Sequence, residues 1–157
     1  MRNSKILYNL ATTQKNKTMI IAVDFDGTIV EHKYPEIGRE RPFAITTLKM
    51  LIEQRHRLIL WTVRKGHLLQ EAVDWCKERG VEFYAVNKNY PEEQVETGGG
   101  YSKINAEVFI DDCNLGGIPD WGKIYQMITE KKSWEELYHA APVEEEAPKK
   151  KKKGWFW

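Results

Sequence analysis

The sequence Val23-Asp24-Phe25-Asp26-Gly27-Thr28 directly follows the apolar run Met19-Ile20-Ile21-Ala22. The apolar run predicts a buried strand, and the Gly-Thr pair predicts a turn at its end. Two carboxylates two residues apart at a partly desolvated strand end repel one another unless a cation lies nearby. This stretch therefore indicates either a metal site or an ordinary strand that ends in an Asp-Gly turn, and residues further along the chain decide between them.

The composition is that of an ordinary globular protein. Of the 157 residues, 41% are hydrophobic and 30% are charged, which suits one domain with a core of its own. The net charge of +1 provides no overall field that would attract nucleic acid or an acidic substrate. Two cysteines form no disulfide framework, and no apolar run approaches the length of a membrane span. These features predict a cytoplasmic protein without a membrane partner.

Strands and amphipathic helices are expected to alternate along the chain. Apolar runs predict strands at residues 18–24, 57–62, 81–86 and 107–111. Helical periodicity predicts helices at residues 43–54, 67–79 and 120–129, followed by one helical turn capped by Ser133 and Glu136. Such alternation predicts an α/β fold whose mainly parallel strands are joined by right-handed crossovers.

Two details of this scheme concern the first helix and the connections. Pro42 suits a first helical turn, and Phe43 is expected on the buried face of that helix with Leu48 and Leu51. Residues 28–41 and 87–101 contain Pro and Gly and are expected to be a loop or small flap and a long loop, respectively.

Both ends of the chain differ from the part between them. Residues 1–17 carry basic and polar side chains but no acidic one, and are expected to be a disordered leader. Residues 18–140 are expected to form the single domain. In residues 141–157, a glutamate block precedes the lysine run Lys149 to Lys153, and charge blocks of this kind do not pack. This segment is expected to be a disordered charged tail.

Polar side chains gather where the predicted strands end. Because ligands of parallel sheets bind beyond the carboxyl ends of the strands, these side chains are expected to share one crevice. Lys103 precedes the last strand, and its long side chain can reach the same edge. The other residues at this edge are Asp24, Asp26, Thr62, Arg64, Asn87, Lys88, Asn89, Asp111 and Asp112.

The chemistry of this set is that of phosphoryl transfer. Four neighbouring carboxylates need a hard cation, and oxygen ligands completed by water favour Mg²⁺. A carboxylate at such a site can attack phosphorus, and a second one can transfer protons. Thr62, Lys103 and the backbone N–H groups of the Asp26-Gly27-Thr28 turn would supply donors for the phosphoryl oxygens.

The order of these motifs resembles that of the haloacid dehalogenase (HAD) superfamily of phosphohydrolases. The resemblance covers residues 19 to about 129 and rests on Asp24-Phe25-Asp26-Gly27-Thr28, Thr62, Lys103 and Asp111-Asp112. It implies a three-layer Rossmann-like fold. The two loops are too short to hold a sizeable cap domain, so the site is expected to be open. Residues 61–64 (Trp-Thr-Val-Arg) are more narrowly similar to small capless hydrolases of bacteria and phages.

The resemblance also implies a role for each carboxylate. Asp24 would be the nucleophile and a metal ligand. Asp26 would be the general acid and base, with its backbone carbonyl on the Mg²⁺. Asp112 would be the more direct ligand of the final pair, with Asp111 in support.

The remaining site residues would bind the substrate phosphate. The resemblance implies that Thr62 and Lys103 hold the transferring phosphoryl group, and that Gly27 and Thr28 face it with their backbone. Arg64 either contacts the substrate or is a solvated arginine that opens a helix.

The expected activity is that of a Mg²⁺-dependent phosphatase acting on a phosphorylated small molecule. One alternative is a phosphatase of nucleotide or nucleic-acid ends, for which the lysine tail would be a tether. Another is a non-enzymatic phospho-acceptor that resembles a response-regulator receiver. In receivers the acidic pair comes early in the chain, whereas here the Asp-x-Asp comes first and the adjacent pair last. An open site also leaves room for a homo-oligomer.

Overall fold

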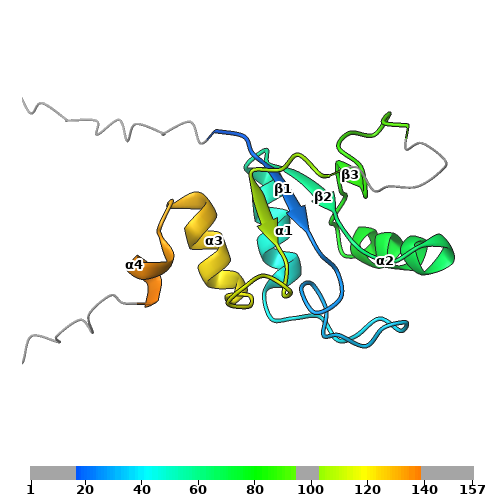
Figure 1. The fold of residues 1–157 in the computed structure, drawn as a ribbon, viewed down its shortest axis with the longest axis horizontal. Helices are drawn as coiled ribbons and strands as arrows, with labels where there is room; N and C mark the ends of the chain where they lie inside the picture. Colours follow the sequence, from blue (N-terminus) through cyan, green and yellow to red (C-terminus); the bar gives the residue numbers. More distant parts are fainter. Residues whose placement is uncertain (1–16, 95–102, 139–157) are drawn as a thin grey trace, which may run out of the picture.

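The computed structural model describes residues 17–94 and 103–138, which form strands and helices of one α/β fold (Figure 1). The predicted tail at 141–157 and most of the predicted leader at 1–17 lie outside the described residues. The elements are β1 (Ile20–Val23), α1 (Ala44–Glu53), β2 (Arg57–Leu60), α2 (Gly66–Glu78), β3 (Ala85–Val86), β4 (Val108–Ile110), α3 (Trp121–Thr129) and α4 (Trp134–Tyr138).

The four strands form one parallel sheet in the order β3-β2-β1-β4. Strand β1 pairs with β2 from Ile20 opposite Arg57 to Val23 opposite Leu60. On its other side β1 pairs with β4. Because every pairing is parallel, the carboxyl ends of all four strands lie along the same edge. The predicted α/β fold with a parallel sheet is therefore confirmed.

The two faces of the sheet are covered differently. Alternate strand residues, such as Val23 and Leu60, join the buried side chains of α1, α2 and α3 in the larger hydrophobic cluster. The opposite face carries a smaller cluster made of Ala22, Ile59, Ala85 and Ile104. Ile104 belongs to the connection between β3 and β4. Within the described residues, therefore, α1, α2 and α3 all cover one face of the sheet, and no helix forms the third layer that the resemblance implies.

Helix α1 illustrates how the helices dock on this face. Its buried residues Ala44, Ile45, Leu48 and Leu51 recur every three or four positions. Phe43 was expected among them, but it is 70% exposed. The helix begins one residue later than predicted, and Phe43 is its N-cap residue with a left-handed backbone. Pro42 accordingly precedes the helix and is not part of its first turn.

Strand β3 is shorter than predicted. Only Ala85 and Val86 pair with β2, although the apolar pattern extends back to residue 81. The Val81 N–H donates to the carbonyl of Cys76 in the last turn of α2, so this residue completes the end of the helix and is not available to a ladder.

Residues 29–41 form a small flap, in agreement with the prediction. The Glu31 N–H donates to the Arg39 carbonyl at 2.8 Å, and the Arg41 N–H donates to the Ile29 carbonyl at 2.9 Å. A Cβ on Gly38 would lie 1.9 Å from the Glu31 carbonyl oxygen. Only glycine therefore allows the two sides of the flap to approach this closely.

The connection from β3 to β4 is closed at its described ends. The Asn105 N–H donates to Oδ1 of Asn89 at 2.7 Å, and Nδ2 of Asn89 donates to Oε1 of Glu93 at 3.0 Å. Residues 95–102 lie between these ends and outside the described residues. Asn89 thus holds together two segments that are 16 positions apart.

The last helix has the predicted capping box. The Ser133 N–H donates to Oε2 of Glu136 at 2.6 Å, and the Glu136 N–H donates to Oγ of Ser133 at 3.2 Å. Among residues 17–94 and 103–138, no helix has the length and apolar character needed to cross a membrane.

The substitution Leu48→Ala tests the assignment of the core. Leu48 is fully buried against the sheet, and its truncation should lower the free energy of unfolding by about 2–5 kcal/mol in urea titrations. Met50→Ala, on the exposed side of the same helix, is the matched control and should change it by less than about 1 kcal/mol. Equal effects of the two substitutions would contradict the docking of α1 described above.

Candidate functional site

A cavity of about 290 Å³ opens at the carboxyl edge of the sheet. Asp24 lines it from the end of β1, Asp111 lines it from the end of β4, and Thr62 lines it from the segment after β2. The remaining lining residues are Trp61, Val63 and Lys65. The structure therefore brings together three of the residues that the sequence placed at this edge.

The turn after β1 packs tightly against Asp112. The Phe25 carbonyl accepts from the N–H groups of Ile29 and Val30 at 3.0 and 3.1 Å, which folds the chain back on itself. Gly27 has φ +87°, and a Cβ there would lie 2.2 Å from Oδ2 of Asp112. A side chain at position 27 would displace the Asp112 carboxylate, so the motif requires glycine for steric as well as conformational reasons.

The Thr28 hydroxyl links two of the carboxylates. It accepts from the Asp112 N–H at 3.0 Å, and its own proton is within reach of both Oδ1 of Asp112, at 3.4 Å, and Asp24. One hydroxyl proton can serve only one of these carboxylates at a time. Nε1 of Trp121 donates to the Thr28 carbonyl at 3.1 Å, so the start of α3 anchors this turn.

Asp24 lies in an unfavourable environment for a carboxylate. Burial, and after it the negative charges of Asp111 and Asp112, raise its pKa from 3.8 to about 7. Hydrogen bonds from the Phe25 backbone and the Thr28 hydroxyl oppose this shift but do not cancel it. The surplus of negative charge and the oxygen donors of the three aspartates fit a hard divalent cation such as Mg²⁺.

Asp111 and Asp112 have different surroundings. Asp111 lines the cavity with Asp24, and its Oδ1 accepts from the Cys113 N–H at 2.8 Å. Asp112 lies against Gly27 and Thr28 and is not among the described residues that line the cavity. Asp111, which was expected only to support Asp112, is therefore the member of the pair that lines the cavity together with Asp24.

Cys113 is exposed, but its surroundings do not activate the thiol for catalysis. Ligand atoms of Asp111, Asp112 and Cys113 lie within 4.8 Å of one another. The charges of Asp112 and Asp111 raise the pKa of the thiol, whereas a reactive cysteine needs a lowered one.

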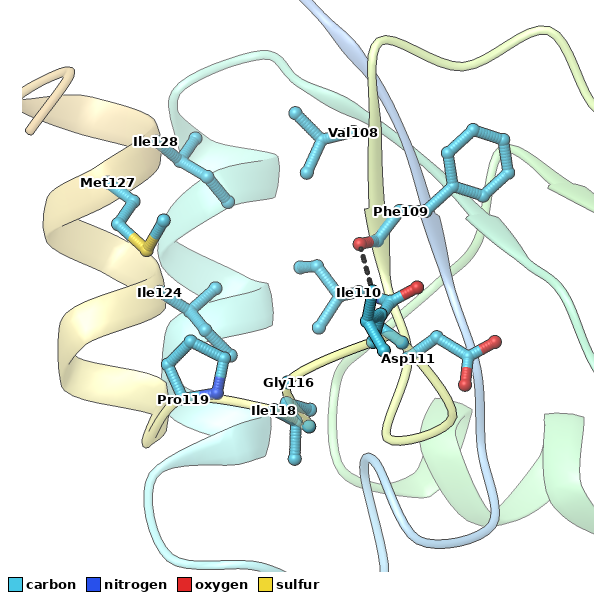
Figure 2. A pocket seen from close by; sticks show the side chains of 13 residues that line it. Val108, Phe109, Ile110, Asp111, Gly116, Ile118, Pro119, Ile124, Met127 and Ile128 are labelled. Carbon is cyan, nitrogen blue, oxygen red and sulfur yellow. Dashed lines mark hydrogen bonds between the residues drawn. The ribbon is translucent and has the colours of Figure 1, made fainter. Parts of the chain in front are cut away.

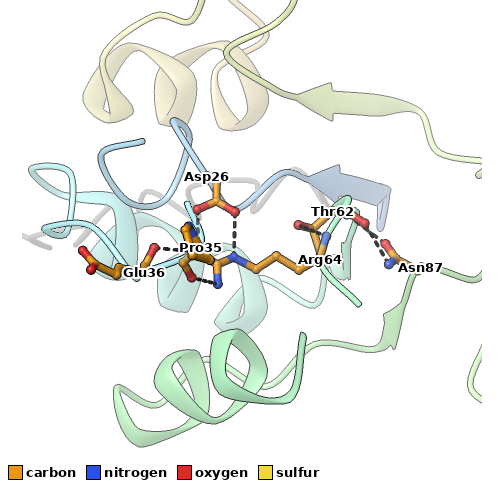
Figure 3. A network of polar contacts seen from close by, with 6 residues as sticks. All are labelled: Asp26, Pro35, Glu36, Thr62, Arg64 and Asn87. Carbon is orange, nitrogen blue, oxygen red and sulfur yellow. Dashed lines mark hydrogen bonds and ion pairs between the residues drawn. The ribbon is translucent and has the colours of Figure 1, made fainter. Parts of the chain in front are cut away.

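Arg64 is buried and paired with Asp26 (Figure 3). Its Nε and Nη2 atoms donate to the two carboxylate oxygens of Asp26, each at 2.7 Å. Nη1 donates to the Pro35 carbonyl at 3.0 Å, and Nη2 also donates to the Glu36 carbonyl at 2.8 Å. Neither expectation for Arg64, a substrate contact or a solvated side chain, agrees with this arrangement. A buried Asp26 needs a partner for both its oxygens, and the planar guanidinium provides it.

Asp26 consequently differs from Asp24. Its carboxylate is buried, and both oxygens already accept hydrogen bonds from Arg64. It is not among the described residues that line the cavity. As the structure stands, a proton transfer by Asp26 would require one oxygen to leave the guanidinium.

Asn87 positions Thr62 (Figure 3). The Thr62 N–H donates to Oδ1 of Asn87, and Nδ2 of Asn87 donates to the Thr62 carbonyl, both at 2.8 Å. Oγ1 of Thr62 accepts from the Arg64 N–H at 3.2 Å, which leaves the hydroxyl proton to donate elsewhere. Asn87 thus holds the strand end that carries Thr62.

Of the two lysines near the site, Lys65 lines the cavity, whereas the predicted Lys103 does not. Lys103 is exposed and is not among the described residues that line the cavity. Lys65 does line the cavity, as the N-cap residue of α2, whose N-terminal end carries a partial positive charge. Lys65 was not predicted at this edge, although it is the next residue after Arg64.

A double-mutant cycle tests the buried pair. Asp26→Asn and Arg64→Met should each lower the free energy of unfolding by about 3–5 kcal/mol, because each leaves a buried group without its partner. The double variant should cost less than the sum of the two, by about 1–3 kcal/mol in urea titrations. The exposed pair Glu31 and Arg39, 2.6 Å apart, is the control, and its variants should leave the urea midpoint almost unchanged. Purely additive costs for Asp26 and Arg64 would contradict a direct interaction.

The raised pKa of Asp24 predicts a pH-dependent stability. The folded protein holds the proton more tightly than the unfolded chain, so stability should fall as the pH rises from 3.8 to about 7. In metal-free buffer at pH 8, Asp24→Asn should be more stable than the parent by about 1–2 kcal/mol, after allowance for solvent screening. Near pH 4 the two proteins should unfold almost alike. Asp74→Asn changes an exposed carboxylate on α2 and is the control, because it should keep the pH dependence of the parent's stability. If Asp24→Asn also kept that pH dependence, the raised pKa of Asp24 would be contradicted.

Comparison with known proteins identifies one family relationship. No protein-family profile matches the chain, and no curated protein matches it. Among solved structures, a conserved protein coded by a locus of Bacteroides thetaiotaomicron has 61% sequence identity and a TM-score of 0.72. The match covers 78% of this chain and 98% of that one. At this identity and coverage, the chain belongs to the same family as the conserved Bacteroides thetaiotaomicron protein.

Proposed function

We propose that this chain is a Mg²⁺-dependent phosphatase of the HAD superfamily that works through an aspartyl-phosphate on Asp24. The observation that carries the proposal is the convergence of Asp24, Thr62 and Asp111 on one cavity at the carboxyl edge of a parallel sheet. The order of the motifs along the chain supports the superfamily and its Rossmann-like fold. The short flap at residues 29–41 is consistent with a site that no cap domain encloses.

The carboxylates at the cavity are suited to hold Mg²⁺. Asp24 and Asp111 would be carboxylate ligands, Asp26 would offer its backbone carbonyl, and Asp112 would support them from its place against Thr28. When bound, the cation would offset the repulsion among the carboxylates and draw negative charge from the phosphoryl oxygens.

The first half of the reaction transfers the phosphoryl group to the protein. An oxygen of Asp24 attacks phosphorus, and the ester P–O bond breaks. The leaving oxygen takes a proton from the carboxyl group of Asp26, one oxygen of which leaves Arg64 for this step. The Thr62 hydroxyl, Lys65 and the N-terminal end of α2 lie where they can neutralise the phosphoryl oxygens. Lys103 would bind the transferring phosphoryl group by turning its exposed side chain toward the cavity.

The second half releases phosphate. A water molecule attacks the phosphorus of the aspartyl-phosphate, its proton goes to Asp26, and the bond between phosphorus and the Asp24 oxygen breaks. Inorganic phosphate leaves, and the Asp24 carboxylate is restored. Arg64 is a positioning residue in this scheme, because it holds the Asp26 carboxyl group and is not among the described residues that line the cavity.

The test is hydrolysis of p-nitrophenyl phosphate. The purified protein should hydrolyse this ester with Mg²⁺ but not with excess EDTA. Asp24→Asn should lose at least about a thousandfold in kcat, because it removes the nucleophile. Asp74→Asn, the exposed carboxylate on α2, is the matched control and should keep full activity.

Two outcomes would contradict the proposal. Full activity of Asp24→Asn would exclude the aspartyl-phosphate on that residue. A phosphorylated form of the parent that persists for hours without turnover would instead favour the receiver-like phospho-acceptor.

A further inference from the structure

A second cavity of about 440 Å³ lies between β4 and α3 (Figure 2). Val108 and Ile110 of β4 point into it from one side, and Ile124, Met127 and Ile128 of α3 face them from the other. We call it the β4–α3 groove. Nearly all of its lining side chains are apolar.

The groove lies at an edge of the sheet. Strand β4 pairs only with β1 among the described strands, so its outer side has no neighbour there. The ring of Phe109 points away from the groove, to the other side of the sheet (Figure 2). Leu115 at the rim is fully exposed. The groove is thus an apolar hollow with buried residues at its floor and a mouth that residues 17–94 and 103–138 leave open.

One end of the groove is acidic. Asp111 lines both the groove and the cavity of the candidate site, and its carboxylate points away from α3 (Figure 2). Asp112 is the next residue along the chain. A ligand of this surface would therefore place apolar groups along α3 and positive charge beside the two aspartates.

The chain itself contains such a segment. Lys149 to Lys153 are five consecutive lysines, and Gly154 separates them from Trp155-Phe156-Trp157. The aromatic residues match the apolar groove, and the lysines match its acidic end. The lysine run and the aromatic residues are therefore adjacent in the sequence, as the apolar groove and its acidic end are adjacent in the structure.

The tether is long enough. The segment follows α4, which begins five residues after α3 ends, so the chain departs close to one wall of the groove. The 16 residues between Tyr138 and Trp155 span up to about 55 Å when extended. Attachment through a tether of this length gives an effective concentration of the order of millimolar, which favours this segment over a separate partner.

We propose that Trp155, Phe156 and Trp157 dock in the β4–α3 groove of their own chain, with Lys149 to Lys153 beside Asp111 and Asp112. Docking requires no phosphatase activity, but Lys149 to Lys153 and Mg²⁺ would share Asp111 and Asp112, so docking is tested in metal-free buffer.

A spin label at Cys113 provides the test in the full-length protein. Cys113 is exposed and follows Asp112, whereas Cys76 is buried, so a nitroxide reagent should modify Cys113 alone. The indole ¹⁵N–H signals of Trp155 and Trp157 can be assigned with Trp155→Phe and Trp157→Phe. In the labelled protein these signals should be several-fold weaker than after reduction of the nitroxide. Unchanged intensities would overturn the proposal.

Groove variants separate docking from accidental proximity. Met127→Glu places a charge in the groove wall and should restore the two indole signals, whereas Met50→Glu, on α1, should not. Leu115→Glu changes a fully exposed rim residue, so it provides the same test without risk to the fold. Broadening that persists in both groove variants would overturn the groove as the binding site.

A mixed sample distinguishes the chain's own segment from that of a second copy. Protein of natural isotopic abundance that carries the nitroxide is mixed with ¹⁵N-labelled protein that carries no nitroxide. Full indole intensities in the mixture are expected. Weakened signals would show docking on a neighbouring copy and would overturn the intramolecular assignment.

Discussion

The buried pair of Asp26 and Arg64 is the contact on which the arrangement of the site depends. Four of the five N–H groups of Arg64 are used, two toward Asp26 and two toward carbonyls of the flap. Asp26 lies two residues beyond Asp24, and Arg64 lies two residues beyond Thr62. The pair therefore joins the segments that follow β1 and β2 and limits how Asp24 can move relative to Thr62. A buried ion pair adds little net stability, but its geometry excludes other arrangements of these segments.

The same pair divides the acidic residues into two kinds. Asp26 has a protein cation of its own, while Asp24, Asp111 and Asp112 form a group whose mutual repulsion contributes to the raised pKa of Asp24. An excess of negative charge is thus confined to the side of the site that opens into the cavity. Burial and repulsion destabilise this group, and such strain is typical of residues kept for binding or catalysis.

Sequence periodicity was sufficient for the parallel sheet, the helices and the clustering of polar residues at one edge. Hydrophobic patterns report local structure, and the rule for parallel sheets converts strand ends into a common site. Periodicity was not sufficient where contacts with residues distant in the sequence determine the local structure. The burial of Arg64 depends on Asp26, 38 positions away, and the shortness of β3 depends on a carbonyl of α2. The three-layer arrangement was expected only from the family resemblance. No pattern of residues indicated on which face of the sheet each helix would pack.

The closed connection between β3 and β4 bears on how such a domain can change. Asn89 and Asn105 hold the two ends of the loop together, independently of what lies between them. Extending the chain between residues 94 and 103 would add closure entropy only slowly, by about 0.6 kcal/mol for each doubling of loop length. The connection also begins just after Asn87, which holds Thr62. A whole folded module could therefore be accommodated there, next to the cavity, while the sheet and its acidic edge stayed as they are.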